Sequence, residues 1–427
     1  MTTRLLNISR AATLATIVVM AWQVNLPVYL PQFDAANLPL PYLLPAVSLA
    51  EITAVIAIAT FALAGWPNDV LLRSGWHRAF ALFLVGLVLF EIVSIAWSAH
   101  RGLAAVQAVH ALSWVAFALL IACADWPAAA MASAFLVGLC VHSLAGLIQI
   151  SLQPLVQITP QNSGISVVFN ATQHLQRVYG LSPHPNVLGG HLAVGAILTG
   201  GLIIMYRRFK RILLSAAWLM IWIALLLTFS RSAWLAVVGG GISAVILLLR
   251  SRQFQPTLIK PLALLSGAGL IAAFAFAVWF WPFLINRIAI TTTFYETQAI
   301  TERLRSAEMA LRIFAAHPLN GVGMAQSIVT AQELAGSPLD WIHNVPLLIA
   351  TELGVGGILL VGLAAIALAA IAARRWRTQS IYMWQALIGG GLIALVIVMQ
   401  FDHYIWTMAQ GGLLWAWLAG WWMRADH

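Results

Sequence analysis

The chain has 427 residues, of which 62% are hydrophobic and 8% are charged, and it contains 19 Trp. This composition excludes a soluble globular protein, because too few polar side chains are available to cover its surface. The formal net charge of +9 indicates attraction to anionic membrane lipids and gives no reason to expect nucleic acid.

Apolar stretches close to the roughly 20 residues that cross a bilayer recur along the whole chain. They predict an all-α polytopic membrane protein, in which residues 1–427 form a single integral membrane domain. About twelve transmembrane helices are expected, at 11–29, 42–64, 79–98, 102–122, 127–150, 185–205, 212–228, 232–249, 261–281, 344–373, 381–399 and 408–423.

The basic residues predict the orientation of these spans, because Lys and Arg near membrane spans are retained on the cytoplasmic side. With the N-terminus inside, fifteen of the 22 Lys and Arg residues lie in inner segments. The remaining seven are outer residues: Arg101, Arg177, Arg231, Arg287, Arg303, Arg305 and Arg312.

Two outer segments are long, at about 151–184 and 282–343. The first is polar and ends in a run that contains His184, Pro185 and Asn186. The second contains a helical stretch at about 296–316, which His317 and Pro318 terminate. Loops of this length in a compact membrane protein usually have a function.

The helix in the second loop has two different charged faces. Arg305, Glu308 and Arg312 are spaced i, i+3 and i+7, which predicts one solvated stripe. Arg303 lies on the opposite, apolar face with Ala310. A guanidinium that points toward packed or membrane-proximal groups needs an anionic partner, so Arg303 is a candidate ligand of an anion.

Other outer features also favour an anion. Arg231 stands at the outer start of span eight and is either an anion ligand or an interfacial anchor, while Arg177 is either a ligand or an exposed loop residue. Spans six, eight and ten present helix N-termini to this side, at Asn186, Ser232 and Asn344. Unpaired amide groups at such ends favour a phosphate.

Transfer chemistry also needs a general base. His343 opens span ten beside the arginine-bearing loop, and imidazole is well suited to accept a proton near neutral pH. A lone His at a membrane interface is more often a headgroup or capping contact. The other outer candidates are His184 and the pair Asp402 and His403, which either orient a catalytic group or cap a helix.

Four short motifs resemble the O-antigen ligase family over roughly residues 175–360. They are Arg177, Gly180, Pro185 and Asn186; Ser230 and Arg231; Glu302, Arg303, His317, Pro318, Gly321 and Gly323; and His343, Asn344, Glu352 and Gly354. The stretch from Asp402 through Tyr404 to Trp406 is similar to the C-terminal part of more generic family members.

The resemblance implies a glycosyltransferase of GT-C type in the bacterial inner membrane, with both long loops and the active site facing the periplasm. It would move a glycan from undecaprenyl pyrophosphate to an acceptor hydroxyl with inversion, without metal or cofactor. It also implies roles for individual residues. His343 would be the catalytic base; Arg231, Arg303, Arg177 and Asn344 would hold the donor; and Glu302, Glu352, Asn186, His184, Asp402, His403 and Tyr404 would support the site.

The acceptor is open among related activities. Lipid A core is the favoured acceptor, and the alternatives are an O-antigen polymerase or an O-linked protein oligosaccharyltransferase. A transporter of lipid-linked glycan is a more remote alternative, which would explain Glu51 and Glu91 inside predicted spans. Against it, the two halves of the chain show no internal repeat, and the polar residues gather at one face.

Overall fold

The computed structural model describes residues 1–28, 46–66, 75–152, 167–169, 174–289, 294–335 and 341–424. Its helices are α1 (Thr2–Val19), α2 (Leu49–Leu63), α4 (Gly75–Ser94), α5 (Arg101–Cys123), α6 (Ala128–Leu152), α7 (Pro185–Met205), α8 (Arg208–Leu227), α9 (Arg231–Leu249), α10 (Ile259–Trp279), α11 (Trp281–Ala289), α12 (Phe294–Ala316), α13 (Ser327–Ala335), α14 (Val345–Arg377), α15 (Met383–Met399), α16 (Tyr404–Thr407) and α17 (Ala409–Met423). Two short antiparallel pairs join β1 (Asn25–Pro27) to β2 (Ala46–Ser48) and β3 (Val167–Phe169) to β4 (His174–Gln176).

The all-α polytopic fold is confirmed. Within the described part of the chain, eight helices are long and apolar enough to cross a membrane: α4 to α10 and α14. The helices α2 and α15 are apolar but shorter. Together with α1 and α17, these helices overlap the twelve predicted spans, one helix to each span, and the count of twelve spans stays a prediction.

The predicted bounds of the first two spans are wrong. Helix α1 ends at Val19, where span one was expected to continue to residue 29. The chain instead forms β1, whose backbone groups pair with those of β2 and therefore do not join a helix. Helix α2 starts only at Leu49, because Ser48 and Glu51 cap its N-terminus through reciprocal hydrogen bonds.

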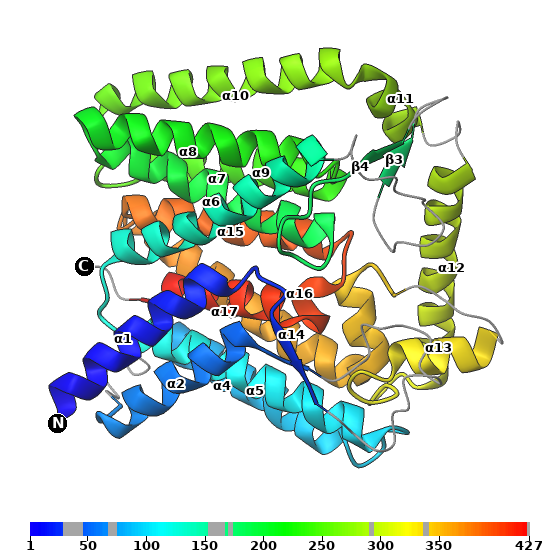
Figure 1. Cartoon of the computed structure of the whole chain (residues 1–427). Coiled ribbons are helices and arrows are strands. Elements are labelled where there is room, and N and C mark those ends of the chain that lie inside the picture. The colour runs from blue at the N-terminus through cyan, green and yellow to red at the C-terminus, as the bar shows by residue number, and fades with distance from the viewer. Residues whose placement is uncertain are drawn as a thin grey trace.

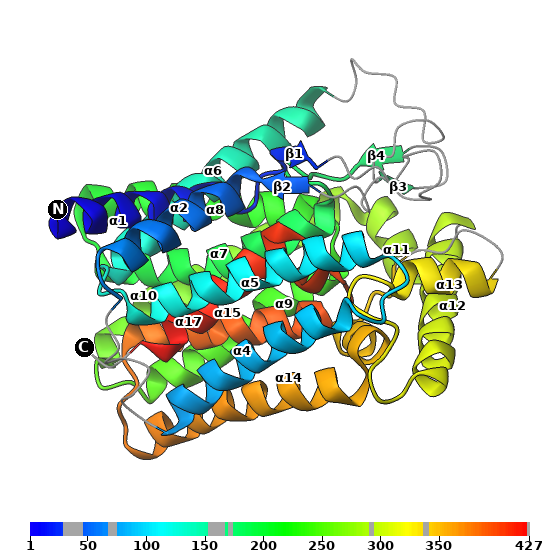
Figure 2. The ribbon, with the colours of Figure 1, turned by 90° about the horizontal axis from the view of Figure 1, so that it is seen from below.

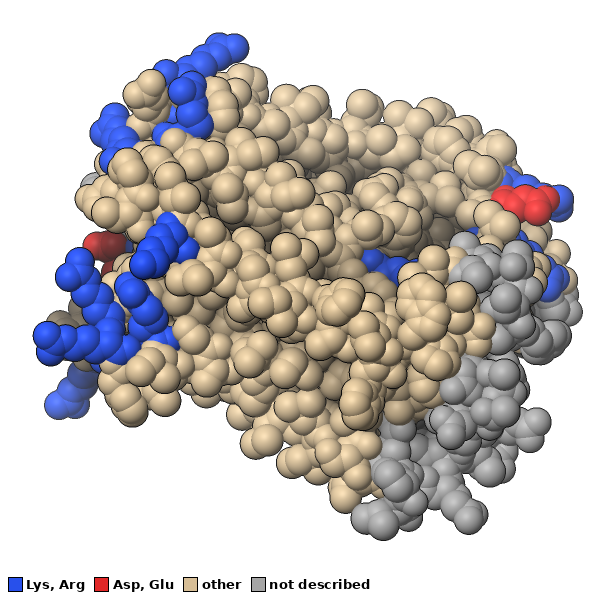
Figure 3. Space-filling model, turned by 90° about the horizontal axis from the view of Figure 1, so that it is seen from above, with Lys and Arg blue, Asp and Glu red and all other residues tan. Residues whose placement is uncertain are grey.

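The long helices run side by side, and both chain ends lie at one end of the bundle (Figures 1 and 2). Lys and Arg side chains gather at this same end in Figure 3. Arg375 shows one way in which this end of the bundle accommodates a cation. Its buried guanidinium donates to the carbonyls of Trp422 and Arg424, each over 2.7 Å, at the C-terminus of α17. Positive charge stabilises the negative end of a helix dipole. Arg73, one of the predicted inner residues, lies outside the described residues.

The opposite end has the two predicted outer loops. Residues 153–166 and 170–173 of the first loop lie outside the described residues, and the rest includes the β3–β4 pair. The second loop contains α11, α12 and α13, and α12 runs across the end of the bundle in Figures 1 and 2. The predicted helix at 296–316 is confirmed, because α12 ends at Ala316, just before His317 and Pro318.

Glycines bring helices together in the bundle core. A Cβ atom added to Gly240 of α9 would lie 2.6 Å from the carbonyl oxygen of Gly390 in α15, so the two backbones touch. Small residues permit this approach in membrane helices. Helix α7 is buried along nearly its whole length. Its N-terminus, at Pro185, is therefore held firmly at the outer end.

Candidate functional site

His343, Asp402 and His403 come together at the outer end of the bundle. The Nδ1 atom of His343 lies 3.9 Å from Oδ1 of Asp402, and the rings of His343 and His403 meet edge to face with centroids 5.3 Å apart. His343 precedes α14, whereas Asp402 and His403 follow α15. Helix packing thus joins two segments about 60 positions apart into one cluster, which we call the His343 cluster.

A chain of hydrogen bonds fixes Asp402. Asn186, in the first turn of α7, donates from Nδ2 to Oδ2 of Asp402 over 2.7 Å, and the backbone amide of His403 donates to Oδ1 over 2.9 Å. Arg177 in turn donates from Nη2 to Oδ1 of Asn186 over 2.7 Å and from Nε to the carbonyl of Thr228, also over 2.7 Å. Arg177, expected to bind the donor or to be exposed, is buried and supports this chain.

The electrostatics of the cluster keep Asp402 charged. Burial raises the pKa of its carboxyl, but the net shift is downward, because the neighbouring histidines and the hydrogen bond from Asn186 favour the anion. Burial, and then the positive charge of Arg177, lower the pKa of His184 to about 3. His184 is therefore neutral near pH 7, and its Nδ1 accepts the amide of Asn186 over 3.1 Å.

The His343 cluster also has the geometry of a metal site. One ligand atom from each of His343, Asp402 and His403 can be chosen so that the three lie within 4.8 Å of one another. His and carboxylate ligands suit a divalent transition metal. In the structure, however, Nδ1 of His403 lies 2.6 Å from the hydroxyl of Thr407, and Asp402 is bound by Asn186, so a cation would compete with these bonds. The expected absence of a metal stays a prediction.

Arg231 begins α9 after a strained turn. Phe229, which is fully buried, has a φ of 48°, and a non-glycine residue in this left-handed region costs roughly 1–3 kcal/mol. Its ring packs against Phe276 and Phe280, which holds the turn in place. The guanidinium of Arg231 donates to the carbonyl of Arg287 over 2.9 Å. The turn thus places a second arginine, Arg287, next to Arg231.

The three predicted helix N-termini lie at this end but differ in how they are capped. His184 caps α7, and Asn344 caps α14 by accepting the amide of Leu347 over 2.9 Å. The Nδ2 group of Asn344 also donates to the carbonyl of Gln400 over 3.2 Å, which leaves its second N–H for a ligand. In α9, the N-cap residue Ser230 makes no capping bond. The backbone amides in the first turn of α9 are therefore better suited to bind an anion than those of α7 or α14.

Arg303 lies on the partly buried face of α12, as the spacing predicts. Ala310, on the same face, packs against Ile342 and Leu348 beside His343. Seven residues of helix separate Arg303 from Ala310, which is about 10 Å of rise. Arg303 makes no hydrogen bond or ion pair with another described residue. The side chain of Arg303 therefore has hydrogen-bonding capacity for a ligand, about three helical turns or less from the residues that pack beside His343.

The other charged residues of α12 follow the predicted solvated stripe. Arg305, Glu308 and Arg312 are exposed, and Arg312 pairs with Glu308 over 2.7 Å. Glu302 accepts a hydrogen bond from Gln298 over 2.7 Å, also on α12. Glu302 and Arg303 are half-buried, and Glu302 is bonded within its own helix.

Helix α14 is broken at Gly354, which has a φ of 63°. The segment after α12 docks on this break: the amide of Val355 donates to the carbonyl of Pro318 over 2.8 Å, and the amide of Gly323 donates to the carbonyl of Glu352 over 2.9 Å. A Cβ atom on Gly354 would lie 2.5 Å from the backbone of Leu319. The glycines of the last two motifs therefore join the outer loop to α14.

Glu352 and Tyr404 stabilise the elements around the cluster. Glu352 is buried and accepts hydrogen bonds from Ser327 over 2.7 Å and from the indole of Trp406 over 2.9 Å. Tyr404 is fully buried, and its ring stacks on His191 of α7 with centroids 6.3 Å apart. Glu352 thereby holds Ser327 and Trp406, and Tyr404 packs α16 against α7.

The sequence reasoning missed Thr407 and did not single out Arg287. Thr407 lies four residues after His403, a spacing that places the two side chains on one face of a helical turn and could have revealed the contact. Arg287 was counted only as an outer basic residue. Its Nε donates to the carbonyl of Phe229 over 3.3 Å, a long-range contact that no local pattern indicates.

Comparison with known families identifies part of this chain. Residues 215–362 match the family model described as O-antigen ligase. The matched segment runs from α8 into α14 and contains Arg231, Arg303 and His343. No curated protein matches the chain. The resemblance predicted from the motifs is confirmed over these residues: the chain is an all-α polytopic membrane protein, and its segment 215–362 matches the O-antigen ligase family.

Proposed function

We propose that the protein is a glycosyltransferase that moves a glycan from undecaprenyl pyrophosphate to an acceptor hydroxyl. Members of the matched family are glycosyltransferase-like membrane enzymes. The observation that supports this most directly is the placement of His343 beside the charged Asp402, inside the matched segment and at the end with few basic residues. By the distribution of Lys and Arg, that end faces the periplasm and the chain crosses the inner membrane.

His343 is proposed to act as the general base. With Nδ1 facing Asp402, Nε2 accepts the proton of the acceptor hydroxyl as its oxygen attacks the anomeric carbon. The bond from that carbon to the pyrophosphate oxygen breaks, and the pyrophosphate leaves with the electron pair. Asp402 stabilises the imidazolium that forms. One direct displacement inverts the configuration at the anomeric carbon.

Arginines supply the positive charge that the leaving pyrophosphate needs. Arg303 faces inward without a described protein partner, and Arg231 lies at the uncapped N-terminus of α9. Both are proposed to bind the pyrophosphate, since a guanidinium can bind phosphate with two parallel hydrogen bonds. Arg177 is proposed to act indirectly, because its hydrogen bonds to Asn186 and Thr228 orient the Asp402 network. The reaction would then proceed without a metal.

Reconstitution tests this function. Purified protein in lipid nanodiscs receives undecaprenyl pyrophosphate glycan and, in separate reactions, lipid A core, a glycan chain end or a hydroxyl-bearing protein, and products are identified by mass spectrometry. We expect transfer to lipid A core, with EDTA leaving the rate unchanged. Transfer only to a chain end identifies a polymerase, and transfer only to protein identifies an oligosaccharyltransferase. Absence of any transfer contradicts the proposal and favours a transporter.

A further inference from the structure

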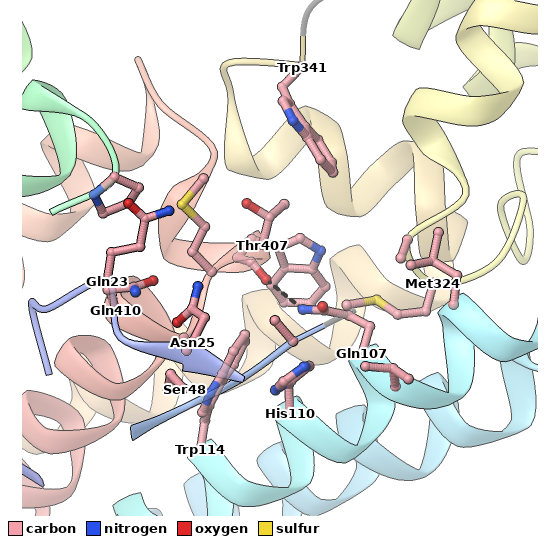
Figure 4. Close-up of a pocket in the computed structure, with 18 of the residues that line it drawn as sticks. Gln23, Asn25, Ser48, Gln107, His110, Trp114, Met324, Trp341, Thr407 and Gln410 are labelled. Atoms are coloured by element: carbon pink, nitrogen blue, oxygen red, sulfur yellow. Dashed lines mark hydrogen bonds between the residues drawn. The ribbon is translucent and has the colours of Figure 1, made fainter. Parts of the chain in front are cut away.

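A cavity of about 320 Å³ lies beside the His343 cluster, between α5, the β1–β2 pair and the segment that joins α16 to α17. Figure 4 shows Trp341 on one side of it and His110 and Trp114 of α5 on the other. The volume is at the lower end of the range of about 300–1,000 Å³ for small-molecule sites. None of the residues named in the predicted site except Glu352 lines this cavity.

The lining combines aromatic faces with neutral hydrogen-bonding groups. Indole rings come from Trp114, Trp341 and Trp406, and carboxamides come from Asn25 and Gln107 among others. No Lys or Arg of the described residues lines the cavity. Its chemistry therefore differs from that of the arginine-bearing side of the site, and it offers a phosphate no cationic partner.

A buried carboxylate fixes one wall. Glu51 accepts hydrogen bonds from the indole of Trp114 and the hydroxyl of Ser48, each over 3.1 Å, and its Oε1 also contacts Nδ1 of His110. Because Nδ1 is engaged, His110 presents its other nitrogen, Nε2, to a ligand. Glu51 is thus explained as an anchor for three lining residues, and an ion pathway is not needed to account for it.

Two carboxamides have hydrogen-bonding capacity left for a ligand. Asn25 is exposed, and its side chain makes no hydrogen bond with another described residue. Gln107 donates from Nε2 to the carbonyl of Trp406 over 3.2 Å, which orients its amide and leaves its carbonyl oxygen as an acceptor. A carboxamide can both donate to and accept from a hydroxyl.

We propose that this cavity binds an uncharged sugar unit. The apolar C–H face of a sugar ring packs on an indole face, while its hydroxyls exchange hydrogen bonds with carboxamides and with His110. A free phosphate or pyrophosphate would find no Lys or Arg among the described lining residues and would face the carboxyl group of Glu352, with that of Glu51 behind the wall formed by His110 and Trp114. The lining therefore selects a neutral polyol over an anion.

The position of the cavity indicates that the bound sugar belongs to the acceptor. This assignment rests on the proposed function. Thr407 and Trp341 both line the cavity and both contact His403. The hydroxyl of Thr407 lies 2.6 Å from Nδ1 of His403, and the ring of Trp341 stacks on that of His403 with centroids 4.9 Å apart. His403 in turn contacts His343. In Figure 1, α16 lies between α9 above and α5 below. A donor held by Arg231 on the α9 side and an acceptor sugar on the α5 side would meet at His343.

Sugar binding can be measured without catalysis. Saturation-transfer NMR on the protein in nanodiscs, with D-glucose, D-galactose and N-acetyl-D-glucosamine as probes, should show at least one sugar receiving signal. Asn25→Ala and Gln107→Leu should each lower the affinity for that sugar by about tenfold, as expected for a lost hydrogen bond. Gln255→Ala, an exposed amide at the basic end, is the control and should match wild type. No signal from any probe, or equal signal in all variants, overturns the proposal.

Kinetics separate the acceptor assignment from the function itself. In the reconstituted assay, Asn25→Ala and Gln107→Leu should raise the KM for the acceptor by about tenfold and leave the KM for the donor unchanged. A raised donor KM with an unchanged acceptor KM overturns the acceptor assignment. If no acceptor is modified while the NMR signal still depends on the two carboxamides, the proposed function fails and the sugar site stands.

Discussion

At the residue scale, the position of Asp402 decides what His343 can do. A carboxylate bound on both oxygens, by Asn186 and by the amide of His403, cannot rotate away from the imidazole beside it. The depressed pKa of Asp402 keeps that carboxylate ionised. This arrangement suits the proton acceptance proposed for His343, because an oriented, charged partner would stabilise the imidazolium as it forms.

Replacement of His343 should remove base catalysis without removing donor binding. Positioned bases typically contribute about 10² to 10⁴ in rate, so we expect a decrease of that order in the single-turnover rate of His343→Ala. Binding of the donor lipid, measured separately, should be unchanged. His77→Ala, at the basic end of the bundle, should behave as wild type. Near-normal transfer by His343→Ala would move the search for the base to His184 or His403.

The two faces of α12 can be compared directly by mutation. Arg303→Lys should lose most activity, because an ammonium cannot reproduce the two parallel hydrogen bonds of a guanidinium on phosphate. Arg305→Lys and Arg312→Lys should be mild, since both side chains are exposed. Initial rates with donor varied would measure the effect. Equal behaviour of the three variants would show that Arg303 does not contact the donor.

At the element scale, α14 shows which parts of the structure the sequence could predict. Apolar residues continue through Gly354, so the pattern predicted one continuous span and hid the break. The break depends on docking by residues 318–323, more than 30 positions earlier, which no local pattern records. In contrast, the inward face of α12 followed from periodicity alone. The bond between Asn186 and Asp402 joins positions 216 apart and required the fold.

Substitution of Gly354 should test this docking. Gly354→Ala forces a Cβ into a left-handed conformation and against the backbone of Leu319. We expect a destabilisation of about 1–3 kcal/mol and a loss of activity. Gly362→Ala is the matched control in the same helix, because its Cβ would meet no atom within 4 Å; it should be neutral or stabilise by up to about 1 kcal/mol. Thermal unfolding in detergent distinguishes the two, and equal melting temperatures would contradict the docking role.

At the scale of the whole molecule, the two ends of the bundle have different compositions. Lys and Arg side chains gather at the end with both termini (Figure 3), whereas α12 lies at the opposite end (Figure 1). The His343 cluster and the cavity also lie at that opposite end. Hydropathy and charge counts predicted this polarity from the sequence. They could not predict the cavity, because its wall combines α5, β1, β2 and residues beyond 320, whose proximity is tertiary.

Cysteine labelling tests the polarity. In a background without Cys123 and Cys140, we expect Gln332→Cys on α13 to react with an impermeant maleimide in intact cells, and Gln253→Cys at the basic end to remain unlabelled. Gln161→Cys, in the part of the first loop outside the described residues, should also react. Labelling of Gln253→Cys before lysis would be incompatible with the twelve-span orientation.

The break in α14 also separates His343, the proposed base, from the part of the helix that has to match the thickness of the membrane. The segment 355–377 spans about 35 Å at 1.5 Å per residue, enough for a hydrocarbon core of about 30 Å. The short outer part, from Val345 to Leu353, is largely buried in protein and held by the docked loop. We therefore expect hydrophobic mismatch to tilt mainly the inner part. The geometry of His343 should then be the same in thin and thick bilayers.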